Sequence, residues 1–298
     1  MKWLISVIMG CFFSAYSGAV AYVFHDGREN VSRVLSMSLS ASSHYQVSVL
    51  NNPQQQLIDG DLVITVGQHS FKKVCESSKQ VSIVALFLGE QEFVQAQAGC
   101  SKPTTAVFSG APLALRLSVL KTFWEDRAPV TIVHSPNIAL GEDLVELSEK
   151  FGVALQSQVI QTGDREQTLK DLTTVLESSN LVLSLYDSVL FDAQFSKDAI
   201  RLMFHKKKAL GAHSLQLVRA GALYGIYSTS QEKLSLVSSY IHVYESSQTL
   251  MPPSYPTPLR VTFNPYLIRM YGLVLPTDRF LIDELGVCPE LGCQESTN

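Results

Sequence analysis

Short apolar runs alternate along the chain with segments whose apolar residues recur at helical spacing. The runs are rich in Val, Ile and Leu, a composition typical of strands that are buried on both faces of a parallel sheet. Strands are therefore expected at 20–25, 46–50, 62–66, 81–88, 105–109, 130–134, 155–160, 181–185, 209–212, 223–227 and 260–263. Between them, the helical sets include Leu113, Leu117, Leu120 and Trp124; Leu169, Leu172 and Leu176; and Phe195, Ala199 and Leu202.

This alternation predicts βαβ units and a doubly wound α/β architecture. The expected strands are too numerous for one compact sheet, so two parallel-sheet lobes joined by a hinge fit the chain better. Breaks at 108–112, near 227–230 and at 251–258 mark the expected crossings between lobes. The predicted organisation is lobe one at 22–109 plus about 229–250, lobe two at 110–228 plus about 258–276, and a C-terminal tail at 277–298.

The first 21 residues have the pattern of a secretory signal peptide. Lys2 precedes a short apolar run, and Ala19-Val20-Ala21 fits the small-residue cleavage site. An uncleaved anchor is one alternative, and lipid attachment at Cys11 is another; so short an apolar run before Cys11 disfavours the second. No later segment reaches the roughly 20 apolar residues that span a bilayer, so the mature chain is expected in the periplasm and not across the membrane.

Charge and cysteine content indicate which partners and which cross-links to expect. Removing residues 1–21 takes away one base and no acid, which leaves 277 residues with 22 bases and 27 acids. A nucleic-acid partner would favour a basic face, so none is expected. The four remaining cysteines favour disulfides in an exported protein, with Cys75–Cys100 and Cys288–Cys293 the favoured pairs. Free thiols are the main alternative, and a zinc site is disfavoured because no second close cysteine pair or nearby His accompanies them.

Polar residues follow the predicted strands repeatedly. In open α/β sheets, ligands bind outside the carboxyl ends of the strands. The strand-end groups are His25-Asp26, Gln68-His69-Ser70, Ser109, His134-Ser135, Tyr186-Asp187, His213-Ser214 and Tyr227-Ser228. Each of them also fits an ordinary wet loop or helix cap, but their recurrence in both lobes indicates a cleft for a small molecule.

Asp187 is the most specific candidate among these groups. Its carboxylate is suited to a ligand ammonium, with Tyr186 adding a cation–π contact, although it fits equally well as a cap for a segment that begins at Ser188. Ser70 and Ser109 are suited to donate to a ligand carboxylate. So are the backbone N–H groups of helices expected to begin at Ser70 and Ala111. Together these groups would suit a zwitterion.

An enzymatic function has less support in the sequence than a ligand-binding one. The chain lacks G-x-S-x-G, G-x-G-x-x-G and a phosphate-binding P-loop, so hydrolase, dinucleotide and nucleotide sites have no motif. His205 and His213 lack the spacing of metal ligands. We therefore expect a protein that is not an enzyme and carries no cofactor or metal.

The C-terminal half resembles the substrate-binding proteins of ABC transporters, of the type I periplasmic-binding fold, in the group whose characterised members bind aromatic amino acids. The resemblance lies in LVRAGALYGIYSTSQE at 217–232, PPSYP at 252–256 and RVTFNPYLIRMYGLVLP at 260–276. Over 23–109 it is weaker and rests mainly on strand order. The resemblance implies ligand contacts at Gln68, Ser70, Ser109, Tyr186, Asp187, His213 and Ser214.

The function that this resemblance implies is capture of a small molecule, such as an amino acid or related zwitterion, in an interlobe cleft for an ABC permease. The first lobe departs from the family after Asn51, where it is Gln-rich and lacks the usual acidic segment. A periplasmic adaptor that presents its ligand to a membrane sensor is therefore the first alternative, and a cleft-based enzyme is the second. A monomer is expected in each case.

Overall fold

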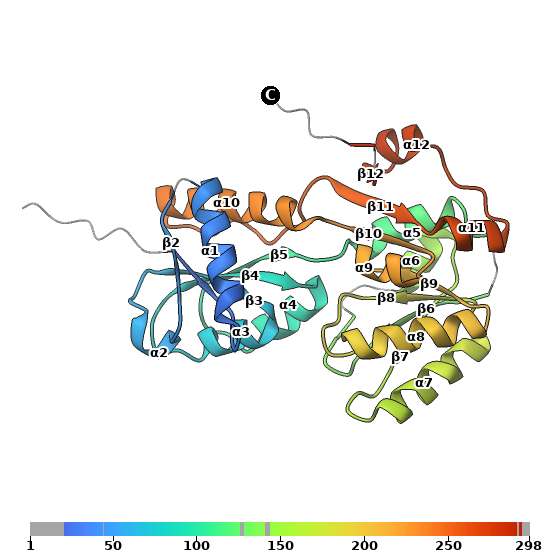
Figure 1. The fold of residues 1–298 in the computed structure, drawn as a ribbon, viewed down its shortest axis with the longest axis horizontal. Helices are drawn as coiled ribbons and strands as arrows, with labels where there is room; N and C mark the ends of the chain where they lie inside the picture. The colour runs from blue at the N-terminus through green and yellow to red at the C-terminus, as the bar shows by residue number, and fades with distance from the viewer. Residues whose placement is uncertain (1–20, 44, 126–127, 141–143, 291, 294–298) are drawn as a thin grey trace, which may run out of the picture.

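The computed structural model describes residues 21–43, 45–125, 128–140, 144–290 and 292–293. It contains two α/β lobes, each built on its own sheet (Figure 1). The doubly wound, two-lobed architecture expected from the sequence is thereby confirmed. The expected signal peptide lies outside the described residues except for Ala21, which is the buried first residue of β1.

The first lobe has a five-stranded parallel sheet in the order β2-β1-β3-β4-β5. Its strands are β1 (Ala21–Phe24), β2 (Val47–Val49), β3 (Leu62–Val66), β4 (Ser82–Leu88) and β5 (Thr104–Phe108). Helices α1 (Glu29–Ser43) and α10 (Ser230–Ser247) pack on one face, and α3 (Gly67–Cys75) and α4 (Glu90–Gln97) pack on the other. The one-turn α2 (Pro53–Gln56) connects β2 to β3. Coverage of both faces explains the unbroken apolar run in β3.

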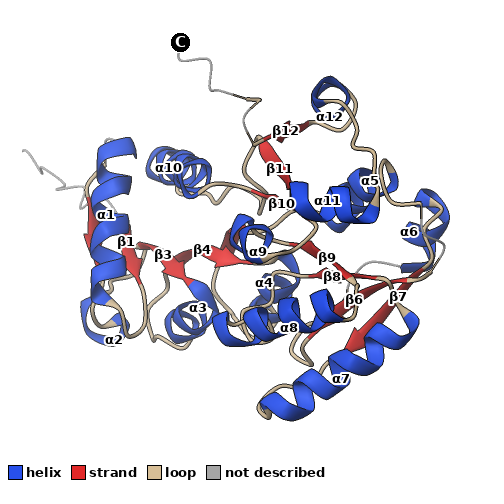
Figure 2. Cartoon of the chain, turned by 45° about the vertical axis from the view of Figure 1, so that its right-hand side comes forward, coloured by secondary structure: helices blue, strands red, loops and turns tan. Residues whose placement is uncertain are grey.

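The second lobe has a seven-stranded sheet in the order β12-β11-β10-β9-β8-β6-β7, parallel except between β10 and β11. Its strands are β6 (Val130–His134), β7 (Leu155–Val159), β8 (Leu181–Ser184), β9 (Ala209–Ala212), β10 (Tyr224–Tyr227), β11 (Leu259–Phe263) and β12 (Val287–Pro289). One face is covered by α5 (Leu113–Lys121), α6 (Leu144–Phe151), α11 (Pro265–Tyr271) and α12 (Asp278–Asp283). The other is covered by α7 (Arg165–Ser178), α8 (Ala193–His205) and α9 (Leu215–Ala220), as Figure 2 shows.

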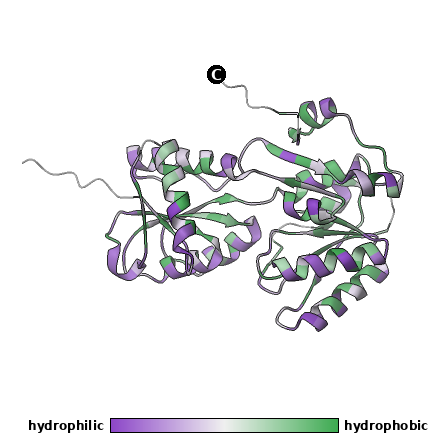
Figure 3. Ribbon diagram, in the orientation of Figure 1, coloured by the Kyte–Doolittle hydropathy of each residue, from purple (hydrophilic) through white to green (hydrophobic). Residues whose placement is uncertain are grey.

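The hydropathy pattern agrees with this layering. Figure 3 shows apolar central strands, whereas helices such as α7 and α8 alternate polar and apolar residues along their length. On α7, Leu172 and Leu176 lie in the core against the sheet, and Lys170 is exposed. Every strand predicted from the apolar runs is present, with small differences at the ends.

Two helices begin away from the positions expected. Helix α3 begins at Gly67 instead of Ser70, and α5 begins at Leu113 instead of Ala111. The segment after His213 forms α9, which was not among the expected elements, and Ser214 caps it by accepting a hydrogen bond from Leu217 N at 3.4 Å. The C-terminal segment 277–298 contains α12 and β12, and β12 pairs in parallel with β11 in the second sheet.

The chain passes between the lobes after β5, between β10 and α10, and between α10 and β11. Helix α10 therefore belongs to the first lobe, although the strands on either side of it belong to the second. The last crossing is tied to the first sheet by a parallel bridge between Val107 and Ser254.

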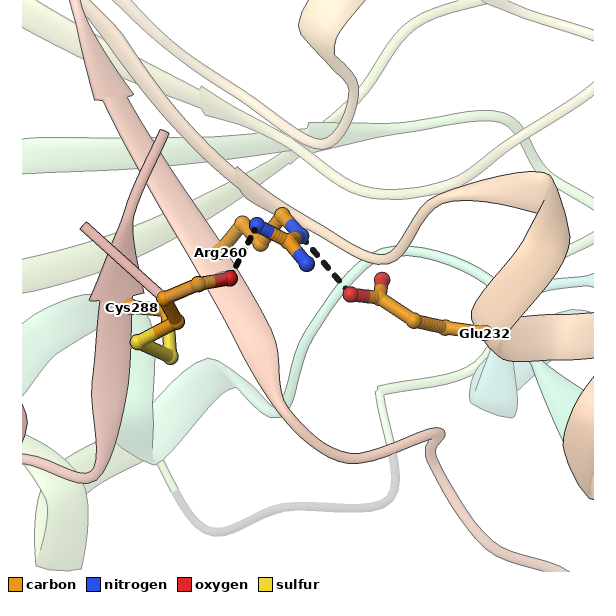
Figure 4. The surroundings of a disulfide bond; sticks show 4 residues. Glu232, Arg260 and Cys288 are labelled. Carbon is orange, nitrogen blue, oxygen red and sulfur yellow. Dashed lines mark hydrogen bonds and ion pairs between the residues drawn. A yellow bond between two sulfur atoms is a disulfide. The ribbon is translucent and has the colours of Figure 1, made fainter. Parts of the chain in front are cut away.

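Both favoured disulfides are present, Cys75–Cys100 and Cys288–Cys293, with Cα–Cα distances of 5.3 and 5.5 Å. The second lies beside the crossings (Figure 4). There Arg260 Nε on β11 pairs with Glu232 Oε1 on α10 at 2.7 Å, and Arg260 Nη1 donates to Cys293 O at 3.3 Å. The C-terminal disulfide loop is thus linked through Arg260 to the start of the helix that returns to the first lobe.

Candidate ligand-binding cleft

A cavity of about 390 Å³ lies between the lobes, and we call it the interlobe cavity. Phe87 on β4 and Ser109 after β5 line it from the first lobe, and Tyr186 and His213, after β8 and β9, line it from the second. The remaining lining residues are Gly110, Ser214, Leu215, Gln216, Arg219, Tyr227, Ser228, Thr229, Ser230 and Lys233. The cavity thus lies at the carboxyl ends of strands from both sheets, where open α/β sheets bind ligands.

The structure brings together four of the residues predicted from the sequence. Ser109, Tyr186, His213 and Ser214 all line the interlobe cavity. Asp187 lines an adjoining cavity of about 560 Å³ in the second lobe, which shares Tyr186, His213 and Ser214 with the first.

Gln68 and Ser70 lie elsewhere. Gln68 lines a separate cavity of about 440 Å³, together with Pro136 and Asn137 of the second lobe. Ser70 is buried, and its hydroxyl accepts a hydrogen bond from Asp26 N at 2.9 Å, which fixes the loop after β1. The structure therefore does not bring these two residues to the cavity around Tyr186.

Tyr186 is one of the points at which the second lobe touches the first. A methyl group built on Gly89 would lie 2.6 Å from Tyr186 O, and one built on Gly110 would lie 3.7 Å from Tyr186 Cβ. Only a glycine allows the approach at position 89, whereas Gly110 has room for a methyl group and is favoured by its positive φ of 81°. Burial raises the pKa of the Tyr186 phenol, which therefore stays protonated at neutral pH.

His213 is an uncharged group in this site. Its ring packs edge-on against Tyr186 with centroids 5.2 Å apart, and its Nδ1 shares a hydrogen bond with Ser184 Oγ at 2.9 Å. Burial, with a smaller contribution from the positive charge of Arg116, lowers the pKa of His213 to about 3. The imidazole is therefore neutral at physiological pH and offers a hydrogen bond without a charge.

Lys233 on α10 brings a buried cation to the interlobe cavity. Its Nζ donates to Ser228 O at 2.6 Å and lies 5.9 Å from the centroid of the Phe87 ring. Burial lowers the pKa of Lys233 to about 8, and the nearby Glu232 opposes this shift. The Ser228 hydroxyl is also buried, and it has no hydrogen-bond partner among the described residues.

Asp187 is fully engaged by backbone donors. Its Oδ2 accepts from Ser135 N at 2.6 Å, and its Oδ1 accepts from Val189 N at 3.1 Å and Leu190 N at 3.0 Å. The side chain is buried. Asp187 therefore fixes the turn after β8 to the loop after β6, as a cap does.

Glu92 on α4 links the two lobes directly. Its Oε1 accepts from Ser188 N at 2.7 Å and from Ser188 Oγ at 2.6 Å, across the cleft. Its Oε2 accepts from Gly89 N at 3.2 Å within the first lobe. The side chain is buried, and burial raises the pKa of Glu92 although these hydrogen bonds oppose the rise.

The raised pKa of Glu92 predicts a pH dependence of stability. The contribution of Glu92 to the free energy of unfolding is fully present below pH 4.5, the ordinary pKa of a glutamate. It is lost as the pH rises through the raised pKa that the Glu92 carboxyl has in the folded protein. Wild type should therefore gain stability relative to Glu92→Gln as the pH falls from neutral to mildly acidic. Melting curves of both proteins across this range measure the difference, and a difference that does not change with pH would contradict the assignment.

Several lining residues were not predicted. Phe87 has a positive φ of 58° at an irregularity in the pairing of β4 with β5, which no feature of the sequence indicates. Lys233 lies on a helix, where a charged residue is usually solvated, and so does Glu92, which joins the lobes without lining the cavity. Tyr227 and Ser228 were within reach of sequence reasoning, because they form one of the strand-end groups.

Among the described residues, no three His, Cys, Asp or Glu side chains lie close enough together to hold a metal ion. Within the same part of the chain, no helix combines the length and the apolar character needed to span a bilayer.

Comparison with known proteins shows similarity of fold at low sequence identity. No protein family and no curated protein matches the sequence. A conserved domain protein from Vibrio cholerae superposes with a TM-score of 0.62 at 14% identity, over 87% of this chain and 95% of its own. A Streptococcus pneumonia ABC domain in complex with L-Trp gives 0.61 at 10%, over 91% and 99%. The ligand-free, open form of a Clostridium difficile substrate-binding protein with adhesive properties gives 0.59 at 10%, over 91% and 97%.

Proposed function

We propose that this chain, which has the type I periplasmic-binding fold, captures a small solute between its lobes and delivers it to an ABC permease. The observation that carries the proposal is the interlobe cavity, because residues from both lobes and from a crossing line it together. A solute bound there would contact both halves of the protein at once. Binding would then favour the closed arrangement by the difference in affinity between closed and open forms.

The chemistry of the cavity supports a solute with an apolar body and a few polar groups. Phe87, Tyr186 and Tyr227 offer rings, and His213 offers a neutral imidazole. The buried Ser228 hydroxyl offers a free hydrogen bond. An amino acid or related zwitterion is the class that we propose first, and the L-Trp complex of the similar Streptococcus pneumonia structure supports it.

The proposed location in the periplasm rests on other features of the chain. The signal-peptide pattern and the two disulfides support export to the periplasm. We further propose that the protein acts as a monomer and releases its solute chemically unchanged. Copurification with a membrane sensor in place of a permease would favour the adaptor function predicted as the alternative.

A thermal-shift screen of the mature protein against amino acids, sugars and small carboxylates tests the proposal. A solute at 100 times its dissociation constant should add about 2.7 kcal/mol to the free energy of unfolding. Recovery of the solute unchanged, checked by mass spectrometry, would support binding without turnover. The proposal fails if no solute raises the melting temperature and native mass spectrometry finds no bound molecule.

A matched pair of variants locates the binding. Gln216 is exposed on α9 and lines both the interlobe and the adjoining cavity, so Gln216→Trp should obstruct them and abolish the shift. Gln167 is exposed on α7, away from these cavities, and Gln167→Trp should leave the shift intact. Equal effects of the two substitutions would place the binding elsewhere.

A further inference from the structure

The loop closed by the second disulfide contacts the wall of the interlobe cavity. This C-terminal disulfide loop, residues 288–293, continues β12 at the edge of the second sheet. The bond between Cys288 and Cys293 spans a sequence separation of 5, so it restricts the path of the chain between them. Glu290, the one charged residue of the loop, is therefore presented to the second lobe from a closed ring.

The two carboxylate oxygens of Glu290 contact different elements of the second lobe. Glu290 Oε1 pairs with Arg219 Nη2 on α9 at 3.3 Å, and Glu290 Oε2 accepts a hydrogen bond from Thr262 Oγ1 on β11 at 2.9 Å. Arg219 is itself a lining residue of the interlobe cavity. Glu290 therefore contacts the cavity wall without lining the cavity.

Thr262 extends this contact to a second lining residue, Tyr227. The Tyr227 hydroxyl lies 3.1 Å from Thr262 Oγ1, which gives its own proton to Glu290. Tyr227 therefore donates to Thr262, and Thr262 donates to Glu290. Burial raises the pKa of the Tyr227 phenol, so the phenol keeps the proton that it donates. Tyr227 lines the interlobe cavity, and this chain of hydrogen bonds fixes the direction of its hydroxyl.

A second contact joins the same loop to a crossing between the lobes. Arg260 Nη1 donates to Cys293 O at 3.3 Å, and Arg260 Nε pairs with Glu232 Oε1 at 2.7 Å (Figure 4). Glu232 Oε2 accepts from Thr229 N at 2.6 Å in the cap that begins α10. Thr229 also lines the interlobe cavity. The loop is thus connected to the cavity wall on α9, at the end of β10 and at the start of α10.

Stability alone is a weak explanation for these contacts. The side chains of Arg219 and Glu290 are 69% and 36% exposed, and ion pairs as exposed as this one contribute little to stability. A disulfide that closes a short loop also restricts the unfolded chain less than one that closes a long loop. The contacts do fix Arg219 and the Tyr227 hydroxyl in advance, and groups that are already fixed lose less freedom when a solute binds.

We propose that Glu290, held in the C-terminal disulfide loop, is a positioning residue for solute binding. It acts through Arg219 and Tyr227 and does not touch the solute itself. The assignment rests on the proposed function and adds to it a determinant of affinity outside the cavity. It also distinguishes the two disulfides, because Cys75–Cys100 lies in the first lobe, where Cys75 lines the separate cavity beside Gln68.

Removal of each disulfide in turn separates positioning from stability. The double variant Cys288→Ser/Cys293→Ser should bind L-tryptophan about threefold to tenfold more weakly than wild type, the range of one neutral hydrogen bond. Its matched control, Cys75→Ser/Cys100→Ser, opens a loop with a sequence separation of 25 and should lose more thermal stability. At a temperature where it is folded, this control should bind L-tryptophan as wild type does. If the loop only stabilised the fold, affinity would follow the melting temperature in both variants.

Point variants locate the effect at Glu290 and Thr262. Glu290→Gln weakens both contacts of the carboxylate, and Thr262→Val removes the hydroxyl with little change of shape; each should weaken L-tryptophan binding by about threefold to tenfold. Thr262→Ser restores the hydroxyl and should recover most of the affinity. Asp283→Asn is the matched control, because it breaks another exposed ion pair of the C-terminal segment, that with Arg279 on α12, and it should leave the affinity unchanged.

A double-mutant cycle tests the path through Tyr227. Tyr227→Phe removes the hydroxyl that Thr262 orients, so Thr262→Val should cause no further loss of affinity in that background. Losses that simply add would show that Thr262 acts by another route, and the path through Tyr227 would be overturned.

Hydrogen exchange of the ligand-free protein tests the positioning role without a solute. The amides of 215–233, which include α9, β10 and the start of α10, should exchange faster in Cys288→Ser/Cys293→Ser and at the wild-type rate in Cys75→Ser/Cys100→Ser. Unchanged exchange, or L-tryptophan binding that none of the loop variants weakens, overturns the positioning role and leaves the binding function standing. If exchange changes as expected but L-tryptophan does not bind wild type, the loop orders the cavity wall and the amino-acid class of the proposed function fails.

Discussion

Replacing Asp187 by alanine should lower the free energy of unfolding by about 3 kcal/mol or more, because three backbone N–H groups, two of them in buried hydrogen bonds, lose a charged acceptor. These donors belong to Ser135, Val189 and Leu190. Ser135 lies on a different strand connection, so the substitution also detaches the loop after β6 from the turn after β8. Urea unfolding of both proteins, monitored by circular dichroism, measures the loss.

Asp192→Ala is the matched control. Asp192 is also an aspartate that accepts from two backbone N–H groups, those of Gln194 and Phe195, but it is an exposed helix cap. Its loss should cost only about 1 kcal/mol. Similar costs for the two substitutions would show that the turn does not depend on Asp187. Asp187→Asn then tests the predicted ammonium contact, because loss of ligand binding in a variant that stays folded would favour that role.

Replacing Gly89 by alanine should shift the protein toward an open arrangement of the lobes. The added methyl group would lie 2.6 Å from Tyr186 O, a backbone atom that cannot turn aside as a flexible side chain can. Crowding of this kind costs about 1–3 kcal/mol, which corresponds to roughly a 5- to 150-fold change in an equilibrium constant. Solution scattering of the ligand-free protein should show a larger radius of gyration, and the affinity for any identified solute should fall.

Gly99→Ala controls for the loss of a glycine in the same lobe. A methyl group there would lie 3.9 Å from its nearest neighbour, Ala96 O, so it meets no obstacle. The scattering profile and the affinity of this variant should match those of wild type. Identical profiles for the Gly89 and Gly99 variants would mean that the Tyr186 contact does not hold the lobes together.

The strands and the two-lobed fold could be predicted because burial on both faces leaves a direct trace in the sequence. The run Leu62-Val63-Ile64-Thr65-Val66 needs no tertiary information to be identified as a buried strand. Helix α9 was missed because six residues complete fewer than two turns, too few to show a helical period. Strand β12 was missed because three residues that include Cys and Pro show no alternation, and its pairing with β11 supplies what the local sequence lacks.

The residues of the candidate site also fall into those that the sequence could predict and those that it could not. Strand-end reasoning predicted Ser109, Tyr186 and His213, because the carboxyl ends of parallel strands meet at one edge. It could not predict Lys233, since a long side chain on a helix gives no indication of whether it reaches solvent or a cavity. For Asp187 the sequence left two roles open. The donor that engages its Oδ2, Ser135 N, lies 52 residues away and is brought there only by the sheet.

The position of α10 has a consequence for how the protein is made. Val237, Tyr240 and Ile241 on this helix complete the core of the first lobe, yet they follow most of the second lobe in sequence. A nascent chain that has just finished β5 therefore carries a sheet with one face incompletely covered. Such surface is prone to aggregation until its partner arrives, and the first lobe cannot complete its core before α10 has been made.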